Sequence, residues 1–425
     1  MSCGGPGASK VYGLAATLAV NTGKQRRHVK RHHTVLIIGG GPAGASAAYK
    51  LAGHGLDAAV VDKAVFPRDK LCGGLLTLRS RTTYSRIFAA PWDPVVDFTA
   101  HGVKFFHRAS LLNEVADSSE LYFTRRLDFD HYLLDQAMRR GATAYLGDAV
   151  VALDIHEKTC RLRSGAEFTF DFMVGADGVN SLVAKSLFGK AFDHDSIAFA
   201  LEMEVDRQQF PQPLDAPEIV FGLARWGYGW VFPKKDTLTV GIGGLHAKNP
   251  ELKKALLAFL ATRFGSIPAG RIKGHYLPFG DYRKVPGRDN VLLCGDAAGL
   301  VEPITGEGIA FAMQSGLYAA EAVIEAAAAG AVALPFYQRR YRHIARDFDH
   351  ANRLRYLLFP SACERLFLKL LPTSRTLPRK HLELMADKLQ YDDYFRYLMF
   401  RALKALAKRA LFINHIDSRS KRHEP

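Results

Sequence analysis

The chain has 425 residues, a length typical of two or three domains rather than one small module. Hydrophobic residues make up 48% of it and charged residues 23%, which excludes a largely disordered, collagen-like or low-complexity protein. The formal net charge of +15 lies at the two ends, because residues 1–33 and 337–425 are rich in Lys and Arg while the middle of the chain is close to neutral.

The basic ends predict an anionic partner, either a phosphate-bearing membrane surface or a nucleic acid. Solvated tails that only aid solubility are the alternative. We expect a membrane surface and no nucleic acid, because no nucleic-acid-binding motif accompanies the charge. No uninterrupted apolar run reaches the roughly 18 to 20 residues that span a bilayer, and the run 11–20 lacks a convincing cleavage site. We therefore expect a cytoplasmic protein that can bind peripherally to a membrane.

The five cysteines are scattered along the chain and form no CxxC pair; they are Cys3, Cys72, Cys160, Cys294 and Cys363. Such spacing is not a disulfide framework and predicts a reducing compartment. It also argues against structural zinc and against an iron–sulfur cluster, whose ligands come as a closely spaced set. We expect no metal.

The first chemical signal is a glycine-rich turn between two predicted strands. The β-branched run 34–38 predicts a buried parallel strand, and it leads directly into GGGPAG at 39–44. An Ala-rich helical pattern follows over 45–52, and a second apolar run over 56–61 ends at Asp62. This order of strand, glycine turn, helix, strand and acid predicts a dinucleotide-binding site.

Each position of this motif has a physical task. Gly39 allows the tight turn, Gly41 lets the backbone approach a pyrophosphate, and Gly44 lets helix and strand pack closely. Asp62 would accept hydrogen bonds from an adenosine ribose, and its charge disfavours a 2′-phosphate. The nucleotide is therefore FAD or NAD rather than NADP.

A second strand-to-helix connection favours FAD. The run LLCGDAAG at 292–299 predicts a strand that ends in a turn, and PITGEGI at 303–309 opens a predicted helix over 310–328. Asp296 at the strand end can hold a ribityl hydroxyl, while the helix N-terminus polarises the N1/O2 edge of a flavin. The alternative is an ordinary strand-to-helix connection.

Two shorter motifs lie between these connections. Arg126, in RRLDFD, precedes a helical pattern, where it either reaches a flavin phosphate or ring edge or pairs with Asp128 or Asp130 on the surface. Asp177, in GADGVNS, is followed by glycine and is expected in a turn.

In this order, GGGPAG, RRLDFD, GADGVNS and GDAAGLVEPITGEGI resemble the motifs of FAD-dependent oxidoreductases of the aromatic-hydroxylase type. FPRDKLCGG at 66–74 resembles the Cys-Gly-Gly stretch of geranylgeranyl reductases, and GYGWVFPK at 227–234 resembles their Tyr-x-Trp-x-Phe-Pro strand. Over about residues 34–328 the chain is therefore similar to the geranylgeranyl reductase family.

At matching positions, the resemblance implies FAD contacts at Ala43, Asp62, Cys72, Gly73, Arg126, Asp296, Gly308 and Ile309. Gly306 and Asp177 belong to the same motifs, and Val150 follows a short predicted strand, near the place of the adenine in the family. Glu302 stands where relatives are expected to carry Asn or Asp, so we expect the longer acid to crowd the far face of the flavin.

The resemblance implies reduction of a prenyl C=C bond, which needs a hydride from reduced flavin and a proton from a nearby acid in a dry cavity. Cys72 either donates that proton or packs against the flavin ring. Tyr228 and Trp230 lie two apart on a predicted strand and so face one side. They line an isoprenoid tunnel or stack near the flavin; ordinary core aromatics are the alternative.

We therefore expect a FAD-dependent reductase that saturates C=C bonds of a polyprenyl chain on a lipid, quinone or diphosphate at the membrane surface. No second glycine-rich nucleotide motif is present, so NAD(P)H or a reduced electron carrier is expected to visit transiently. The alternatives are a flavin monooxygenase (hydroxylase) of the same superfamily and a non-catalytic, flavin-loaded electron-relay or lipid-binding protein.

The expected fold is α/β: a GxGxxG FAD-binding domain, Rossmann-like and of the glutathione-reductase type, with an antiparallel β-sheet substrate domain and a helical C-terminal region. The expected boundaries are 1–33 for a basic N-terminal extension, 34–95 with 125–190 and 285–335 for the FAD-binding domain, 96–124 with 191–284 for the substrate domain, and 336–425 for the basic helical region. Within the last, 395–413 predicts a basic amphipathic helix that lies on a membrane or packs on the protein.

Overall fold

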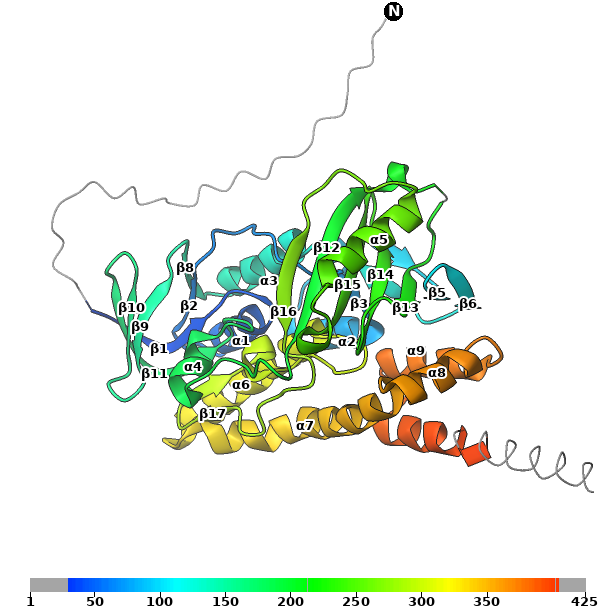
Figure 1. The fold of residues 1–425 in the computed structure, drawn as a ribbon. Helices are drawn as coiled ribbons and strands as arrows, with labels where there is room; N and C mark the ends of the chain where they lie inside the picture. Colours follow the sequence, from blue (N-terminus) through cyan, green and yellow to red (C-terminus); the bar gives the residue numbers. More distant parts are fainter. Residues whose placement is uncertain (1–29, 212, 402, 405–425) are drawn as a thin grey trace, which may run out of the picture.

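The computed structural model describes residues 30–211, 213–401 and 403–404 (Figure 1). Two large β-sheets lie side by side, and helices cover one of them and connect it to a group of C-terminal helices. Most of the predicted N-terminal extension, including the run 11–20, lies outside the described residues.

The first sheet has eight strands and a parallel centre, in which β1 lies between β11 and β2. Its strands are β1 (Arg31–Ile38), β2 (Ala58–Asp62), β8 (Thr143–Leu146), β9 (Val150–Asp154), β10 (Thr159–Leu162), β11 (Glu167–Gly175), β17 (Gly287–Arg288) and β18 (Val291–Leu293). The central strands are buried on both faces, which explains why their sequences are continuous apolar runs rather than alternating ones.

Helices cover this sheet and bring distant parts of the chain together. They are α1 (Pro42–Ala52), α2 (Leu78–Ile87), α3 (Arg126–Arg139), α4 (Leu182–Phe188) and α6 (Ile309–Ala329). Helix α1 packs against α3 and α6, and the contact with α6 is close because a Cβ at Gly316 would stand 2.1 Å from the carbonyl oxygen of Ala43. The start of the FAD-binding unit and its last helix therefore form one layer.

The first strand begins earlier than predicted, at Arg31, inside the expected N-terminal extension. Its polar start pairs in parallel with Phe168 to Phe170 of β11. His33 is buried and reaches Asp57 through Nδ1 at 3.0 Å. These long-range partners, rather than local hydrophobicity, extend the strand.

The second sheet has seven strands and is antiparallel except where β13 pairs with β5. In spatial order its strands are β16 (Lys273–Leu277), β12 (Ala198–Asp206), β15 (Thr237–Leu245), β14 (Gly227–Pro233), β13 (Glu218–Phe221), β5 (Val103–His107) and β6 (Ser110–Val115), and α5 (Leu252–Phe264) packs on it. A small third sheet contains β3 (Leu75–Leu76), β7 (Leu121–Phe123) and β4 (Phe98–Ala100). The predicted substrate-domain segment 96–124 is therefore divided between two sheets.

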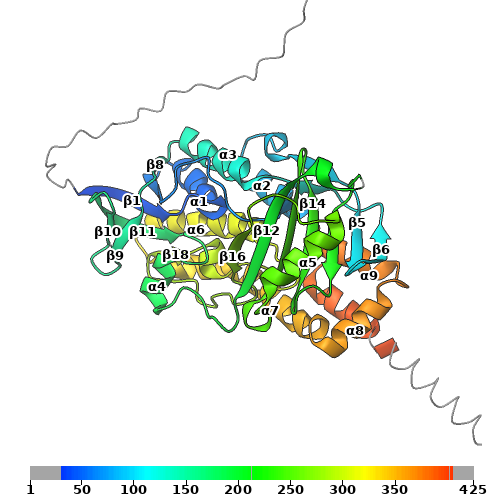
Figure 2. The same ribbon diagram turned by 45° about the horizontal axis from the view of Figure 1, so that its top comes forward.

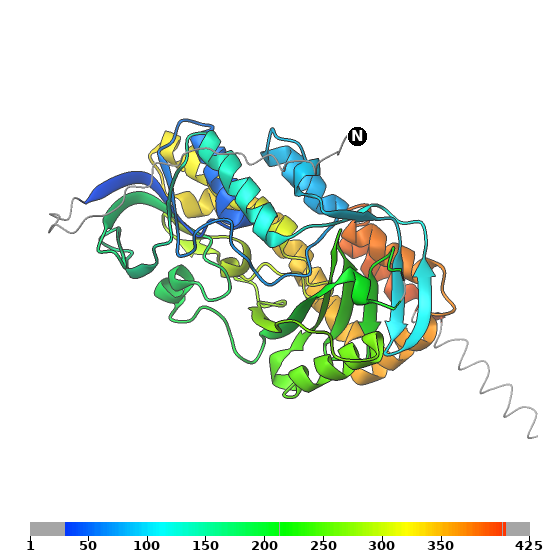
Figure 3. The ribbon, with the colours of Figure 1, turned by 90° about the horizontal axis from the view of Figure 1, so that it is seen from above.

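The C-terminal region continues from the helical layer to the second sheet. Helix α7 (Ala333–Leu358) packs along α6 and leads to α8 (Ser361–Leu370) and α9 (Thr376–Met385), which lie beside β5 and β6 in Figures 1, 2 and 3. Asn113 of β6 donates to the carbonyl oxygen of Leu371 at 2.9 Å, and Phe221 of β13 packs edge-on against Phe367 of α8. The region is thus part of the folded body.

The predicted amphipathic helix over 395–413 is described only in part. Residues 391–401 are helical, and Phe400 and Leu403 are exposed. The other apolar positions of the expected stripe, Leu406, Ala410 and Ile413, lie outside the described residues. Within the part of the chain that the structure covers, no helix has the length and hydrophobicity to cross a bilayer.

Candidate active site

A cavity of about 610 Å³ runs between the two large sheets, a size typical of ligand and cofactor sites. At one end it is lined by the loops after β1, β2, β11 and β18, which are the carboxyl ends of the parallel strands. In open α/β sheets this edge is where nucleotides bind. At the other end it is lined by strands of the second sheet and by α8 and α9.

The glycine turn has the geometry that the sequence predicts. Gly39 has a φ of +102°, and a Cβ there would stand 2.3 Å from the carbonyl oxygen of Ala176. A Cβ at Gly44 would stand 1.9 Å from the carbonyl oxygen of Gly39, so helix α1 can lie this close to β1 only with glycine at that position. Gly41 and Ala43 both line the cavity, and Gly41 is the N-cap of α1.

Asp62 ends β2 beside this turn and also lines the cavity. Its carboxylate accepts one hydrogen bond from the backbone N–H of Gly40 and one from that of Ala64, each at 2.8 Å. Each carboxylate oxygen has a second lone pair. Asp62 can therefore hold the glycine turn and still accept hydrogen bonds from a ribose.

Asp296 lies opposite, in the short helix η4 (Gly295–Ala298) after β18, and pairs with Lys70 at 3.1 Å. Burial alone would raise the pKa of this carboxyl, but the Lys70 ammonium outweighs burial and holds the pKa below its ordinary value. The loop that follows carries Gly306 with a φ of +72°, and Gly308 is the N-cap of α6 before Ile309. Asp296, Gly306, Gly308 and Ile309 all line the cavity.

The two helix N-termini at this cavity fit FAD. Neither Gly41 at the start of α1 nor Gly308 at the start of α6 has a side-chain cap, so backbone N–H groups at both helix starts remain available. Such a terminus binds anions, and here one suits the pyrophosphate and the other the N1/O2 edge of a flavin. The residues present therefore match both the nucleotide end and the flavin end of the cofactor.

Arg126 is more deeply buried than the sequence suggested. Its guanidinium donates to both oxygens of Asp130, at 2.6 and 2.7 Å, and Arg68 reaches the same carboxylate at 2.9 Å. The predicted alternative of pairing with Asp130 is thus found, but inside the protein instead of on the surface. Arg126 also lines the cavity, so pairing and cofactor contact are compatible.

Two further predicted contacts also line the cavity. Val150 is the first residue of β9. Both carboxylate oxygens of Asp177 accept hydrogen bonds from the start of α4, from Ser181 Oγ at 2.5 Å and from the N–H of Leu182 at 2.6 Å. We therefore infer that the side chain of Asp177 holds the start of α4, which leaves its backbone to face a cofactor.

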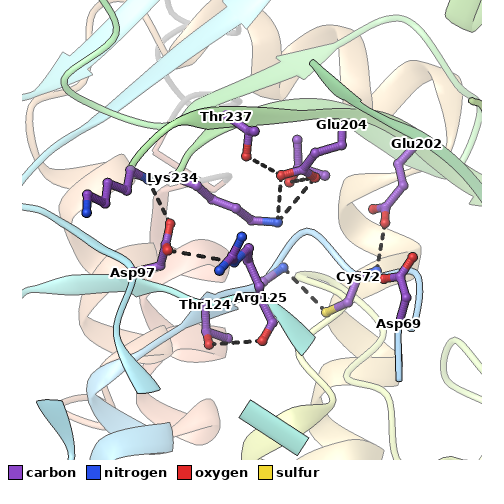
Figure 4. Close-up of polar contacts among 12 residues, drawn as sticks. Asp69, Cys72, Asp97, Thr124, Arg125, Glu202, Glu204, Lys234 and Thr237 are labelled. Carbon is purple, nitrogen blue, oxygen red and sulfur yellow. Dashed lines mark hydrogen bonds and ion pairs between the residues drawn. The ribbon is translucent and has the colours of Figure 1, made fainter. Parts of the chain in front are cut away.

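Cys72 and Gly73 line the cavity where its two halves meet, and Figure 4 shows the polar contacts of Cys72. The backbone N–H of Cys72 donates to Oε1 of Glu202 at 2.8 Å, and Cys72 Sγ accepts from the N–H of Gly74 at 3.4 Å. A Cβ at Gly73 would stand 2.8 Å from the ring of Phe232. Glycine is therefore required for this segment to lie against the aromatic residues of β14.

Tyr228 and Trp230 both line the cavity from β14, with ring centroids 6.1 Å apart. The Tyr228 hydroxyl donates to the carbonyl oxygen of Thr305, which ties the second sheet to the loop before α6. Burial raises the pKa of Tyr228 above its ordinary value. This hydroxyl is thus engaged in positioning, whereas the indole N–H of Trp230 has no hydrogen-bond partner among the described residues.

Glu202 and His275 are polar residues of the cavity that the sequence did not reveal; Glu202 is buried and His275 is half-buried. Glu202 lies on β12 and His275 on β16, two neighbouring strands of the second sheet. Glu202 Oε2 and His275 Nε2 are buried without hydrogen-bond partners among the described residues. A Glu within an alternating strand pattern was the available signal, but the sequence alone does not say which face of the strand meets the cavity.

Glu302 contradicts the expectation that it crowds the flavin. Its Oε2 accepts from the N–H groups of Ile304 and Thr305 and from the Thr305 hydroxyl, so the side chain turns into its own loop. Glu302 is buried and does not line the cavity. The longer acid shapes the loop that precedes α6.

Arg79 of α2 connects this loop to the C-terminal helices. It donates to Glu307 at 3.3 Å and to the carbonyl oxygen of Leu384 at 3.0 Å.

We expect Arg79→Met to lower the free energy of unfolding by about 3 kcal/mol, because Glu307 would be left buried without its cation. Arg81, on the same helix as Arg79, forms a half-exposed ion pair with Glu120, and its loss in Arg81→Met should cost less than about 1 kcal/mol. Urea unfolding compares the two, and equal losses would contradict this assignment.

Comparison with known proteins agrees with this site. A family model described as a FAD binding domain matches residues 32–225. Together with the two helix N-termini at the cavity, this match identifies the chain as a FAD-dependent oxidoreductase. Among the residues that the structure describes, no group of three or more His, Cys, Asp or Glu side chains could hold a metal ion.

Characterised relatives define the family. The chain is 30% identical to a chloroplastic geranylgeranyl diphosphate reductase of Nicotiana tabacum over 74% of this chain and 71% of that protein. It is 29% identical to a menaquinone reductase of Mycolicibacterium smegmatis over 76% of this chain and 84% of that protein. A geranylgeranyl bacteriochlorophyll reductase-like protein of Thermoplasma acidophilum shares the fold, with a TM-score of 0.70 and 22% identity over 87% of this chain and 99% of that one. The chain belongs to the geranylgeranyl reductase family.

Proposed function

We propose that this protein is a FAD-dependent reductase that saturates C=C bonds of a geranylgeranyl-like polyprenyl chain carried on a lipid, a quinone or a diphosphate. One observation carries the proposal: a single cavity joins the loops that fit FAD to an apolar end. The apolar end is lined by Val103, Phe105, Leu121, Ile219, Phe221, Phe232, Phe367, Leu371, Leu377, Leu382 and Met385. The names of its relatives, which include reductases of a geranylgeranyl diphosphate and of menaquinone, support the same substrate class.

Bound reduced FAD would supply a hydride to one carbon of the alkene. The task of the chain is to exclude water and to align the prenyl chain, because an isolated alkene offers no charge or hydrogen-bonding group to hold. Trp230 and Phe232 lie beside Gly73, where the cofactor end meets the apolar end. We assign positioning of the alkene to Trp230, attachment of the second sheet to the loop before α6 to Tyr228, and contact with the reacting edge of the flavin to Cys72.

The source of electrons and the site of action are further parts of this proposal. NAD(P)H or a reduced carrier protein would reduce the bound FAD and then leave. The basic C-terminal region, with Tyr356, Phe400 and Leu403 exposed, suits a surface of anionic lipid. The full chain should then sediment with vesicles containing anionic lipid and not with neutral vesicles, and added salt should release it. Equal sedimentation with both kinds of vesicle would contradict this.

The proposed function is tested by incubating the dithionite-reduced holoenzyme anaerobically with geranylgeranyl diphosphate, menaquinone and an unsaturated archaeal-type prenyl lipid. Mass spectrometry should find products heavier by two hydrogens for each saturated bond. If every substrate keeps its mass while the FAD remains reduced, the proposal is wrong, and a flavin-loaded lipid-binding protein becomes the better description.

A further inference from the structure

Glu202 lines the cavity at the junction of its two halves. Its carboxyl group lies beside Cys72, as Figure 4 shows. Only 7% of the residue is exposed. Its Oε1 accepts the N–H of Cys72 at 2.8 Å, which fixes the orientation of the carboxyl group. Its Oε2 is buried and has no hydrogen-bond partner among the described residues. A buried polar atom without a partner is costly, which points to a role for this oxygen in the reaction.

The charged side chains around Glu202 are mostly engaged elsewhere. Lys234 lies 3.3 Å from both oxygens of Glu204, and Lys273 is paired with Asp69. Glu202 itself forms no ion pair among the described residues. The titratable groups that face it are Lys234, Glu204, Lys273, Cys72 and the half-buried His275.

Burial therefore dominates the protonation of Glu202. It raises the pKa of the carboxyl to about 7, against the opposing effects of the Cys72 N–H bond and of the Lys234 charge. A buried carboxyl without a countercharge favours its neutral form. Near neutral pH a substantial share of the molecules thus carry an O–H group at this position. Burial has the opposite effect on His275. It lowers the pKa of the imidazole to about 4, so His275 is neutral near pH 7 and is not an acid there.

We propose that Glu202 is the catalytic acid that delivers the proton in reduction of the prenyl double bond. The inference rests on the proposed function and adds the residue that completes it. Bound reduced FAD would supply a hydride, which is a proton with two electrons, to one alkene carbon. As the π bond breaks, the O–H bond of Glu202 breaks and its proton forms a C–H bond at the other carbon. The alkene is reduced, the cofactor is oxidised, and the carboxylate left on Glu202 takes up a proton from water.

The acidity of the Glu202 carboxyl and its position both favour Glu202 over Cys72 in this role. General acids work best when their pKa lies near the working pH, and the carboxyl meets this condition. Its free oxygen belongs to a side chain held by the backbone of Cys72, so the two residues stand at the same place with different tasks. Cys72 would pack against the cofactor and orient the acid.

The decisive variant is Glu202→Gln in the FAD-loaded full-length protein. Glutamine keeps the shape and the acceptor for the Cys72 N–H but has no acidic proton. We expect the FAD spectrum and the rate of FAD reduction to stay unchanged, while kcat for prenyl reduction falls by about 100-fold or more. In the wild type, kcat should be highest at low pH and fall as the pH rises through about 7, because the acid is lost. This pH dependence should be absent from Glu202→Gln.

Glu204→Gln is the matched control, since Glu204 lies two residues along β12 and does not line the cavity. At low pH, the kcat of the Glu204→Gln variant should equal that of the wild type. Because the Glu204 charge contributes to the raised pKa of Glu202, the midpoint of the pH profile should move to lower pH.

A second readout does not depend on turnover. In the infrared difference spectrum between the oxidised wild-type holoenzyme and Glu202→Gln, the C=O stretch of a protonated carboxylic acid should be present at low pH as a wild-type band and should be lost as the pH rises through about 7. Absence of this band from the wild type at low pH, or a kcat of Glu202→Gln within about threefold of the wild type, overturns the inference. Failure of the proposed function looks different, because the wild type itself would then leave every prenyl substrate unchanged, and the role of Glu202 would be rejected with it.

Discussion

Gly41→Ala should fold normally but bind FAD at least about tenfold more weakly, a loss of roughly 1.4 kcal/mol. Gly41 has φ −73° and ψ −172°, a conformation open to any residue. The nearest atoms to an added Cβ are Arg68 Nη2 at 3.4 Å and Asp130 Oδ2 at 4.0 Å, so the apoprotein has room for it. The methyl group would instead stand at the start of α1, where the pyrophosphate would lie.

Gly44→Ala, three positions along the same turn, is the matched comparison. Its Cβ would meet the carbonyl oxygen of Gly39 at 1.9 Å and would push α1 away from β1. We expect this variant to lose about 1 to 3 kcal/mol of stability as well as FAD. Thermal unfolding of the apoproteins and fluorescence titration with FAD separate the two effects. If Gly41→Ala binds FAD as tightly as the wild type, the pyrophosphate does not lie on this turn.

Leu382→Trp should shorten the apolar end of the cavity and exclude long prenyl chains. Leu382 lies on α9, is 7% exposed and lines the cavity with Leu371 and Leu377. A larger side chain there takes space that the far end of a twenty-carbon chain would occupy. Reduction of geranylgeranyl diphosphate should fall at least about tenfold, while reduction of the ten-carbon geranyl diphosphate should fall much less.

Leu366→Trp on α8 is the control for this prediction, because Leu366 is 40% exposed and does not line the cavity. It should reduce both soluble diphosphates at the wild-type rate. The prediction is tested by measuring steady-state rates with the two chain lengths. FAD absorption confirms that each variant is loaded with cofactor. An equal loss for both substrates in Leu382→Trp would mean that the prenyl chain does not extend to α9.

The parts predictable from the sequence are those whose signal is local. An apolar run followed by Gly39, Gly41 and Gly44 specifies strand, turn and helix at once, because the φ of +102° at Gly39 and the contact of Gly44 with the Gly39 carbonyl arise within the turn itself. Asp62 and Asp296 were predicted for the same reason, since Asp62 ends β2 and Asp296 follows closely after β18, at the edge of the sheet where nucleotides bind. The family and the cofactor followed from these positions.

The parts not predicted depend on which surfaces meet in three dimensions. The alternation of β12 shows that Glu202 and Glu204 share one side of the strand, but not that one faces the cavity and the other pairs with Lys234. The apolar stripe of a C-terminal helix likewise predicts which residues are buried, but it does not show which surface of the protein they pack against. Residues such as Leu371 and Leu382 therefore were not predicted to line the cavity, although the structure gives them that place.

The central claim is tested most directly by a single anaerobic turnover of the reduced holoenzyme with geranylgeranyl diphosphate. The absorbance of FAD and the mass of the product are followed together. The account predicts that one C=C bond is saturated for each FAD that returns to its oxidised form, in the absence of oxygen. FAD that is reoxidised only after oxygen is admitted, with an oxygen atom found in the product, would contradict the account and identify a monooxygenase.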